Sequence, residues 1–281
     1  NDDDGWRKAG RDSRLTFTAP ADGTYVVRVS DVREQGGERF AYRLTVREPE
    51  PDFRVTNRAR TPSVAVGGGR EIEFQVDRID GFEGDVEVTI ENLPEGYRAA
   101  SPVVIEAGHF AAQSVLVAAA DAAELDAEAW KQVKITARAV VNGSPVEQAV
   151  AGFTNVKLMA EPKLRVRLEP AEVVIRPGGT TTAKLVVERN GFDGDVKFEV
   201  NNLPHGVIVD NIGLSGILVR AGENEREFFF AARDWVGETS RTCQAVASVD
   251  GHASPPIVLH VARGSELAKA AAAGGEPDAE E

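Results

Sequence analysis

Residues 81–96 read GFEGDVEVTIENLPEG, and a second copy of this stretch decides the fold. Residues 191–206 read GFDGDVKFEVNNLPHG, which aligns without gaps at a shift of 191 − 81 = 110 residues, with nine identical positions. Upstream, residues 64–76 match residues 175–187 at a shift of 111 residues. Because order and spacing persist over nearly the full length of the unit, the sequence indicates a duplicated domain.

Apolar and polar residues alternate within each copy. Phe74 and Val76 are flanked by charged or amide residues, the period of two expected of a strand with one buried face. Asn142-Gly143, between two such runs, is a strong signal for a tight hairpin. Short strands with turn sequences every 8–12 residues, roughly, are typical of an antiparallel β-sandwich. Only residues 119–132 have a helical composition, and we predict one short helical crossing there.

The first 50 residues differ from the repeats. They contain three runs that predict strands, at 13–20, 23–31 and 40–48, separated by turn sequences. Three strands make only half a sandwich, so we expect the remaining strands to precede Asn1 in a longer protein. Pro-rich acidic connectors, EPEPDF and AEPKL, join the three units and predict a beads-on-a-string arrangement.

These residues resemble two bacterial families. The series from NDDDGW through GRDSRLTFTAPADGTYVVRVSDVREQGGERFAYRLTV resembles the C-terminal half of the pre-peptidase C-terminal domain, over about 48 residues. The Gly-Phe-x-Gly-x-Val and Leu-Pro-x-Gly series of both repeats is similar to bacterial immunoglobulin-like surface repeats. The first resemblance implies a secreted jelly-roll sandwich, as found in planctomycete-type exported proteins. Together they imply exported, modular, non-catalytic sandwiches.

The predicted fold class is therefore all-β: tandem antiparallel β-sandwiches, a partial jelly roll followed by two immunoglobulin-like domains. The predicted domains are the pre-peptidase-type half module at 1–49, the first sandwich at 50–160 and the second at 161–262. Residues 263–281 have no apolar face and end in acidic residues, which predicts a disordered acidic tail.

Charge and composition exclude several classes of protein. With 32 basic and 45 acidic residues the formal net charge is −13, which disfavours binding to nucleic acid or to anionic lipid. No apolar run approaches the roughly 20 residues needed to span a bilayer, so no membrane insertion is expected. A lone cysteine, Cys243, rules out an intrachain disulfide and a cysteine-based zinc site, and we interpret it as a small buried residue. Scarce cysteine fits both the cytosol and a bacterial exported protein.

We find no catalytic pattern in the sequence. The four histidines, at positions 109, 205, 252 and 260, have no ligand-like spacing and are predicted to lie on the surface. The triple glycine at 67–69 is followed by neither a helix nor a Lys-Ser/Thr pair, so a strand-connecting turn is favoured over a phosphate loop. The three tryptophans, Trp6, Trp130 and Trp235, are isolated, which favours core or capping positions over a carbohydrate platform.

Acidic clusters are the one place where the sequence suggests a ligand. Asp2, Asp3 and Asp4, together with Asp12, are the candidate oxygen ligands for a structural Ca²⁺ ion, although their spacing does not fit an EF-hand loop. Glu83 with Asp85, and Asp193 with Asp195, flank a glycine in each repeat and are weaker candidates; a turn-capping carboxylate explains Asp85 as well as a metal does. No other cofactor is predicted.

Three functions remain open at this point. The first is a non-catalytic structural and adhesive segment of a modular bacterial exported or cell-surface protein, extracellular or periplasmic. It would be monomeric, space or present domains of the same longer chain, and contact an extracellular protein or a polysaccharide. The second is a carbohydrate- or matrix-binding accessory module of an upstream secreted hydrolase. The third, a hydrolase in its own right, lacks any supporting motif.

Overall fold

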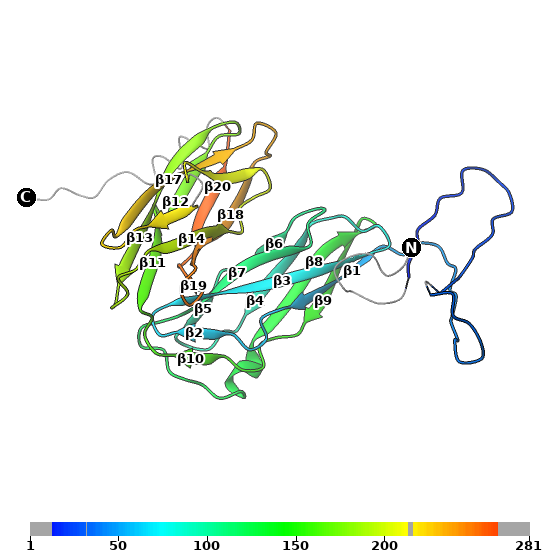
Figure 1. Ribbon diagram of the computed structural model, residues 1–281, viewed down its shortest axis with the longest axis horizontal. Helices are drawn as coiled ribbons and strands as arrows, with labels where there is room; N and C mark the ends of the chain where they lie inside the picture. The colour runs from blue at the N-terminus through cyan, green and yellow to red at the C-terminus, as the bar shows by residue number, and fades with distance from the viewer. Residues whose placement is uncertain (1–12, 32, 213–215, 264–281) are drawn as a thin grey trace, which may run out of the picture. The chain divides into compact units, whose positions relative to one another are not determined.

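The computed structural model describes residues 13–31, 33–212 and 216–263 (Figure 1). Within this part of the chain it contains twenty β-strands and a single short 3-10 helix, so the predicted all-β class is confirmed. Contacts divide the chain into two compact units, one of residues up to 54 with 77–82, and one of residues 55–76 with those from 83 onward. These units do not follow the repeat boundaries, so the domain limits given above stay predictions.

The strands fall into two series, one in each copy of the repeat. The first copy contains β1 (Asp52–Asn57), β2 (Ser63–Ala65), β3 (Gly69–Ile79), β4 (Val86–Glu91), β5 (Tyr97–Ala99), β6 (Val103–Ile105), β7 (Ala111–Ala118), η1 (Ala129–Gln132), β8 (Lys134–Val141), β9 (Ser144–Val150) and β10 (Lys157–Met159). The second contains β11 (Leu164–Glu169), β12 (Glu172–Ile175), β13 (Thr180–Arg189), β14 (Val196–Asn201), β15 (Val207–Asp210), β16 (Ile217–Val219), β17 (Glu225–Ala232), β18 (Thr239–Ala247), β19 (His252–Ala253) and β20 (Ile257–Val261).

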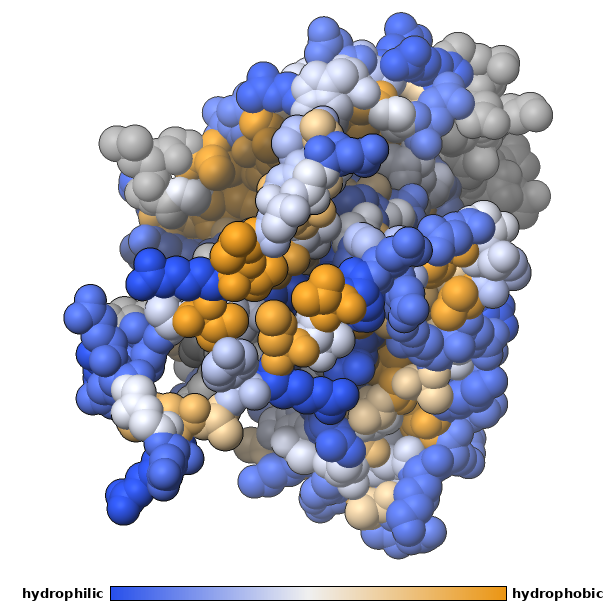
Figure 2. Space-filling view, turned by 90° about the vertical axis from the view of Figure 1, so that its right-hand side faces the viewer, coloured by the Kyte–Doolittle hydropathy of each residue, from blue (hydrophilic) through white to orange (hydrophobic). Residues whose placement is uncertain are grey.

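The three strands predicted at 13–20, 23–31 and 40–48 do not form. Residues 13–31 and 33–49 contain no strand, and no jelly-roll sheet is present there. An apolar sheet face is stable only where a second layer covers it, and the apolar side chains of this segment are exposed instead. Figure 2 shows apolar residues, in orange, at the surface of the face that it presents. The exposed apolar residues of the segment are Leu15, Phe17, Tyr25, Val26, Val27, Val29, Phe40, Tyr42, Leu44 and Val46.

The residue before each Gly-Phe pair binds the connector that precedes its repeat. Asp80 accepts a hydrogen bond from the backbone N–H of Glu50 at 2.9 Å and forms an ion pair with Arg47. The Glu50 hydrogen bond, followed by the one from Arg47, lowers the pKa of Asp80. In the second repeat, Asn190 donates its side-chain amide to the carbonyl of Pro162 at 3.3 Å. Both acidic connectors are therefore held at a defined point rather than being free linkers.

The first copy contains the predicted sandwich layers. Strands β6, β4, β8 and β9 form a four-stranded antiparallel sheet, and β3 pairs with β7, which pairs with β5, in another. β8 and β9 stay in register from Val141 opposite Ser144 to Ile135 opposite Val150, so the hairpin predicted at Asn142-Gly143 is confirmed. The alternating apolar residues of β3 point inward, as expected, and are buried: Ile72, Phe74 and Val76.

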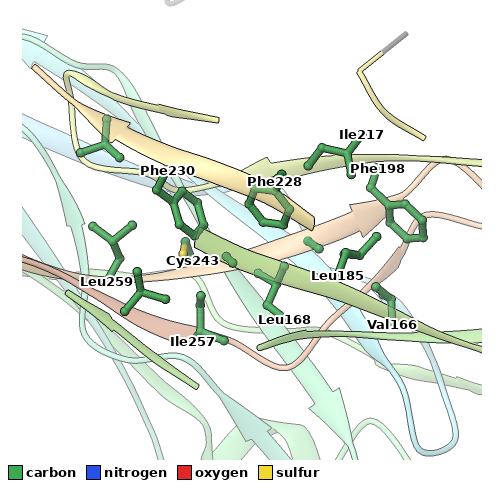
Figure 3. Close-up of a cluster of buried hydrophobic side chains, with 14 of the residues drawn as sticks. Val166, Leu168, Leu185, Phe198, Ile217, Phe228, Phe230, Cys243, Ile257 and Leu259 are labelled. Carbon is green, nitrogen blue, oxygen red and sulfur yellow. The ribbon is translucent and has the colours of Figure 1, made fainter. Parts of the chain in front are cut away.

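The second copy encloses its own core. Strands β11, β13, β17 and β15 form one antiparallel sheet, while β12, β20, β18, β14 and β16 pair in the second layer. Leu185 and Phe228 project from the first layer and Phe198 and Leu259 from the second, and all four are buried (Figure 3). Burying an aliphatic or aromatic side chain of this size stabilises the fold by about 1.5–3 kcal/mol. Cys243 lies in the same core, as predicted, and burial raises the pKa of its thiol to about 12.

The helix predicted at 119–132 is reduced to the single 3-10 turn η1. A stretch this short is marginal as an isolated helix, so side-chain packing determines its conformation. Trp130 is buried with its ring edge-on to Tyr97 (ring centroids 4.8 Å apart) and to Phe153 (5.9 Å). The packing of this ring holds η1 as a single turn, after which the chain enters β8.

Candidate functional site

The stretch at 81–96 and its second copy are a fold signature rather than a binding site. Asp85 accepts a hydrogen bond from the backbone N–H of Ala107 at 2.6 Å, and Asp195 accepts the equivalent bond from Ala221 at 2.8 Å. Each carboxylate therefore caps the loop that follows the neighbouring edge strand. No group of three or more metal-ligating side chains occurs among the described residues. Asp2, Asp3, Asp4 and Asp12 lie outside those residues.

Recurring positions in the signature share one unusual backbone conformation. Three positions in each copy have positive φ angles between 59° and 89°. Glycine adopts this conformation without a steric penalty, and asparagine tolerates it better than most residues. These residues therefore recur because the turns require them: Gly81 with Gly191, Asn92 with Asn202, and Gly96 with Gly206.

Gly206→Ala is expected to destabilise the second sandwich more than Gly191→Ala. Both residues have φ near 90°, which costs an alanine about 1–2 kcal/mol. A Cβ at Gly206 would also lie 2.5 Å from the ring of Trp235 and 2.7 Å from Val236, whereas nothing lies within 4 Å at Gly191. We expect losses of about 2–4 and 1–2 kcal/mol, respectively, by calorimetric unfolding. Equal losses would show that the contact with Trp235 and Val236 adds no steric cost.

The two sandwiches are joined through a short backbone pairing. The hairpin strand β19 pairs antiparallel with β3, placing His252 opposite Arg70 and Ala253 opposite Gly69. A sheet path consequently runs from β18 through β19 into β3 and β7. We call this junction the seam, defined by β3, β19 and the side chains that contact across it. A loose beads-on-a-string arrangement is wrong for residues 55–76 and those from 83 onward, because they form one compact unit.

The triple glycine at 67–69 has a role that the sequence did not reveal. A Cβ at Gly69 would lie 2.4 Å from the carbonyl oxygen of Ala253, and one at Gly68 would lie 2.6 Å from the ring of His252. Only glycine therefore lets β19 approach so closely. The second repeat has Thr180 where the first has Gly69, and this difference between copies was the available signal.

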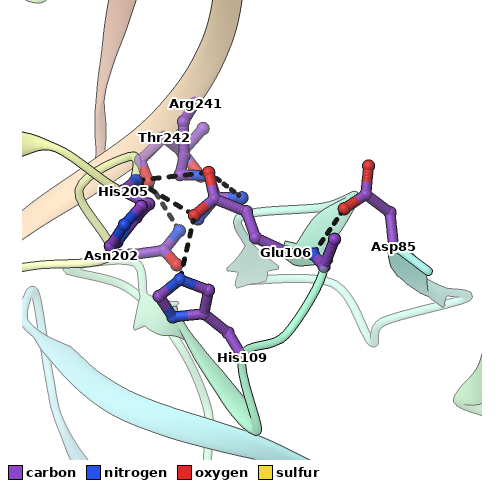
Figure 4. Close-up of polar contacts among 8 residues, drawn as sticks. Asp85, Glu106, His109, Asn202, His205, Arg241 and Thr242 are labelled. Carbon is purple, nitrogen blue, oxygen red and sulfur yellow. Dashed lines mark hydrogen bonds and ion pairs between the residues drawn. The ribbon is translucent and has the colours of Figure 1, made fainter. Parts of the chain in front are cut away.

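A buried ion pair crosses the seam (Figure 4). Arg241 of β18 lies 3.2 Å from the Glu106 carboxylate, and its side chain is only 9% exposed. Glu106 also accepts a hydrogen bond from the backbone N–H of His205 at 3.0 Å. Burial lowers the pKa of the Arg241 guanidinium, while Glu106 and then Asp85 oppose that shift. One carboxylate of the first sandwich therefore binds two groups of the second.

A second carboxylate repeats this arrangement. Glu71 of β3 accepts hydrogen bonds from the side-chain amides of Asn201 at 2.9 Å and Gln244 at 2.8 Å. Next to it, Ala100 and Val115 pack against Ala253 in a small apolar cluster. The seam thus combines backbone pairing, apolar contact and directional polar contacts, which together specify one geometry.

Three of the four histidines lie at the seam. His205 is exposed and His109 partly exposed, whereas His252 is buried, so the predicted surface position is wrong for His252. The rings of His109 and His205 come from different sandwiches, and their centroids are 4.7 Å apart. His252 is buried, and this burial, together with Arg165, lowers its pKa to about 4 against the opposing charge of Asp250. His260 lies away from the seam, where its Nδ1 is 2.7 Å from the hydroxyl of Ser240.

The two described tryptophans differ in exposure. Trp130 is 1% exposed and belongs to the core of the first sandwich, as described above. Trp235 is 58% exposed and its ring centroid lies 5.1 Å from that of His205, so it borders the seam. A carbohydrate platform that uses both rings is therefore excluded. Trp6 lies outside the described residues.

Comparisons with known proteins identify no family for this chain. No family model matches it, and no curated protein sequence matches it. None of the helical structure among the described residues is long and apolar enough to cross a bilayer.

Among the solved structures that match are domains of the S-layer protein SbsC and of intimin, at low similarity. Domains 4 and 5 of the S-layer protein SbsC are 16% identical over 47% of this chain and 65% of their own length, with a TM-score of 0.27. Domains 5–6 of SbsC are 13% identical over 76% of this chain and 98% of their own, with the same TM-score. The D0-D1 domain of intimin is 12% identical, covering 73% of this chain and 97% of its own, with a TM-score of 0.26. Similarity at this level is too low to support a conclusion about function.

Proposed function

We propose that this chain is a non-catalytic structural and adhesive segment of a modular bacterial exported or cell-surface protein. In this function the paired sandwiches hold neighbouring domains at a fixed separation and present a loop or edge strand to an extracellular partner. The segment acts as a monomer within its longer chain. The seam is the observation that carries this proposal, because a spacing role requires two sandwiches that do not swing freely.

The pattern of differences between the repeats supports a spacing role. Turn residues recur in both copies, whereas residues at the seam, such as Gly69, differ between copies. A chain selected only for two independent folds gains nothing from such a specialised junction. The resemblance of both repeats to bacterial immunoglobulin-like surface repeats supports the same function.

The test is replacement of the second sandwich in the full-length protein, in the organism that makes it. Residues 161–262 are exchanged for an unrelated sandwich of similar size, and surface exposure is measured by protease shaving of intact cells. If the chain only spaces domains, a rigidly joined replacement restores function and a flexibly joined one does not. If the partner binds this sandwich, neither replacement restores adhesion. Absence of the protein from the cell surface would contradict the proposal.

A second candidate function, a polysaccharide-binding accessory module, is favoured only by the exposed ring of Trp235. Aromatic rings bind sugars through their faces, and a single exposed ring is the minimum for such a contact. Retention on insoluble polysaccharide that is abolished by Trp235→Ala would establish this function. Unchanged retention in that variant, or no retention of the parent chain, would exclude this ring as the binding site.

A further inference from the structure

We propose that the seam is an acid-sensitive latch: protonation of the buried His252 releases the two sandwiches from each other. This inference deepens the proposed spacing role and rests on the same seam. It assigns a purpose to a buried histidine in the two-residue strand β19.

The first part of the latch is the histidine pair across the seam (Figure 4). His109 and His205 are in edge contact, and Glu106 lies 3.9 Å from the Nε2 atom of His109. Arg241 forms an ion pair with the same Glu106 carboxylate at 3.2 Å. Asp85 is the other acidic group whose charge acts on Arg241, and Trp235, packed on His205, is neutral. Release of the seam breaks these contacts.

The second part of the latch is His252 in the strand β19. It is buried, and the charged groups that act on it are Arg165 of β11 and Asp250 of its own turn. Arg70, opposite it on β3, donates a hydrogen bond to the carbonyl of Asp250 at 2.9 Å. Arg165 is itself paired with Glu161 at 2.8 Å and Glu188 at 3.8 Å. A protonated His252 would therefore be a buried cation close to two arginines.

The direction of the effect follows from His252. Its pKa in the closed seam, about 4, is below the ordinary histidine value of about 6.5. The released state consequently binds the proton more readily, so closure is strongest well above pH 6.5 and weakens as the pH falls from about 6.5 toward 4. If release exposes His252 to solvent, the ratio of closed to open molecules falls roughly 100-fold between pH 7.5 and 4.5 from this group alone.

Single-molecule energy transfer tests the latch directly on the full chain. Dyes are attached through Glu87→Cys in β4 and Arg226→Cys in β17, both exposed positions, while the buried Cys243 does not react. We expect a narrow distribution of transfer efficiencies at pH 7.5 and a broad one at pH 4.5, with circular dichroism confirming that both sandwiches remain folded. A distribution already broad at pH 7.5 would contradict the spacing role. One that is narrow at both pH values would contradict only the latch.

Histidine variants separate the latch from general acid effects. His252→Gln should move the midpoint of release to lower pH, because the buried ring at this position can no longer charge. His260→Gln is the matched control, away from the seam, and should leave the midpoint unchanged. An unchanged midpoint in His252→Gln would mean that carboxylates drive release, and would overturn the role of His252.

Discussion

Replacing Trp130 by alanine is expected to lower the free energy of unfolding of the first sandwich by about 3–5 kcal/mol. The indole is 1% exposed and packs edge-on against the rings of Tyr97 and Phe153. Trp130 belongs to η1, and its removal leaves a cavity beside the rings of Tyr97 and Phe153. Differential scanning calorimetry measures the loss as a lower transition temperature of the full chain.

Trp235→Ala is the matched control for this prediction. The ring is 58% exposed, so its removal should cost less than about 1 kcal/mol. Comparable losses in the two variants would contradict the assignment of Trp130 to the core. The contrast also distinguishes the buried Trp130 from Trp235, the one exposed tryptophan among the described residues.

Arg241→Ala is expected to uncouple the two sandwiches while leaving each folded. The guanidinium is nearly buried and shares Glu106 with the backbone of His205. Removing the guanidinium leaves the Glu106 carboxylate partly desolvated and without this partner. Because Glu106 retains some exposure, we expect a loss of about 2–3 kcal/mol of coupling between the sandwiches. Broadened transfer efficiencies at pH 7.5 in the doubly labelled chain measure the uncoupling.

Two controls sharpen the Arg241 prediction. Arg138→Ala removes an exposed pair with Glu147 inside the first sandwich and should cost no more than about 0.5 kcal/mol, with no uncoupling. Arg241→Met combined with Glu106→Gln removes both charges and should recover part of the lost coupling, since no unpaired charge remains. If Arg241→Ala leaves the sandwiches coupled, the ion pair does not hold the seam.

Much of the fold could be predicted because its signals are local. The alternation of apolar residues in β3, the Asn-Gly hairpin and the repeated Gly-Phe and Leu-Pro-x-Gly turns each depend on neighbours a few residues apart. The duplication strengthened these predictions because positions that recur, such as Gly96 and Gly206, reveal a backbone requirement. The sequence left a turn cap and a metal ligand as equal explanations for Asp85, and the structure shows that Asp85 and Asp195 each accept a backbone hydrogen bond in a loop.

The seam could not be predicted because its contacts join residues far apart in sequence. Glu71 and Gln244 are separated by 173 positions, and no periodic pattern indicates which side chains will meet over such a distance. The glycine at position 69 is a visible difference between the repeats, but the reason for it is the close approach of β19, which the sequence does not show. The prediction of strands in residues 13–49 was wrong for the opposite reason. Apolar residues alternate locally there, but the described residues contain no second layer to cover an apolar sheet face.

The central claim is that the seam makes the two sandwiches one body at neutral pH. Nuclear magnetic relaxation of backbone amides tests it most directly, because it gives a rotational correlation time for each sandwich separately. At pH 7.5 we predict the same correlation time for amides of β4 and β8 in the first sandwich as for those of β13 and β17 in the second. Two shorter, different values, each close to that of an isolated sandwich, would contradict the claim.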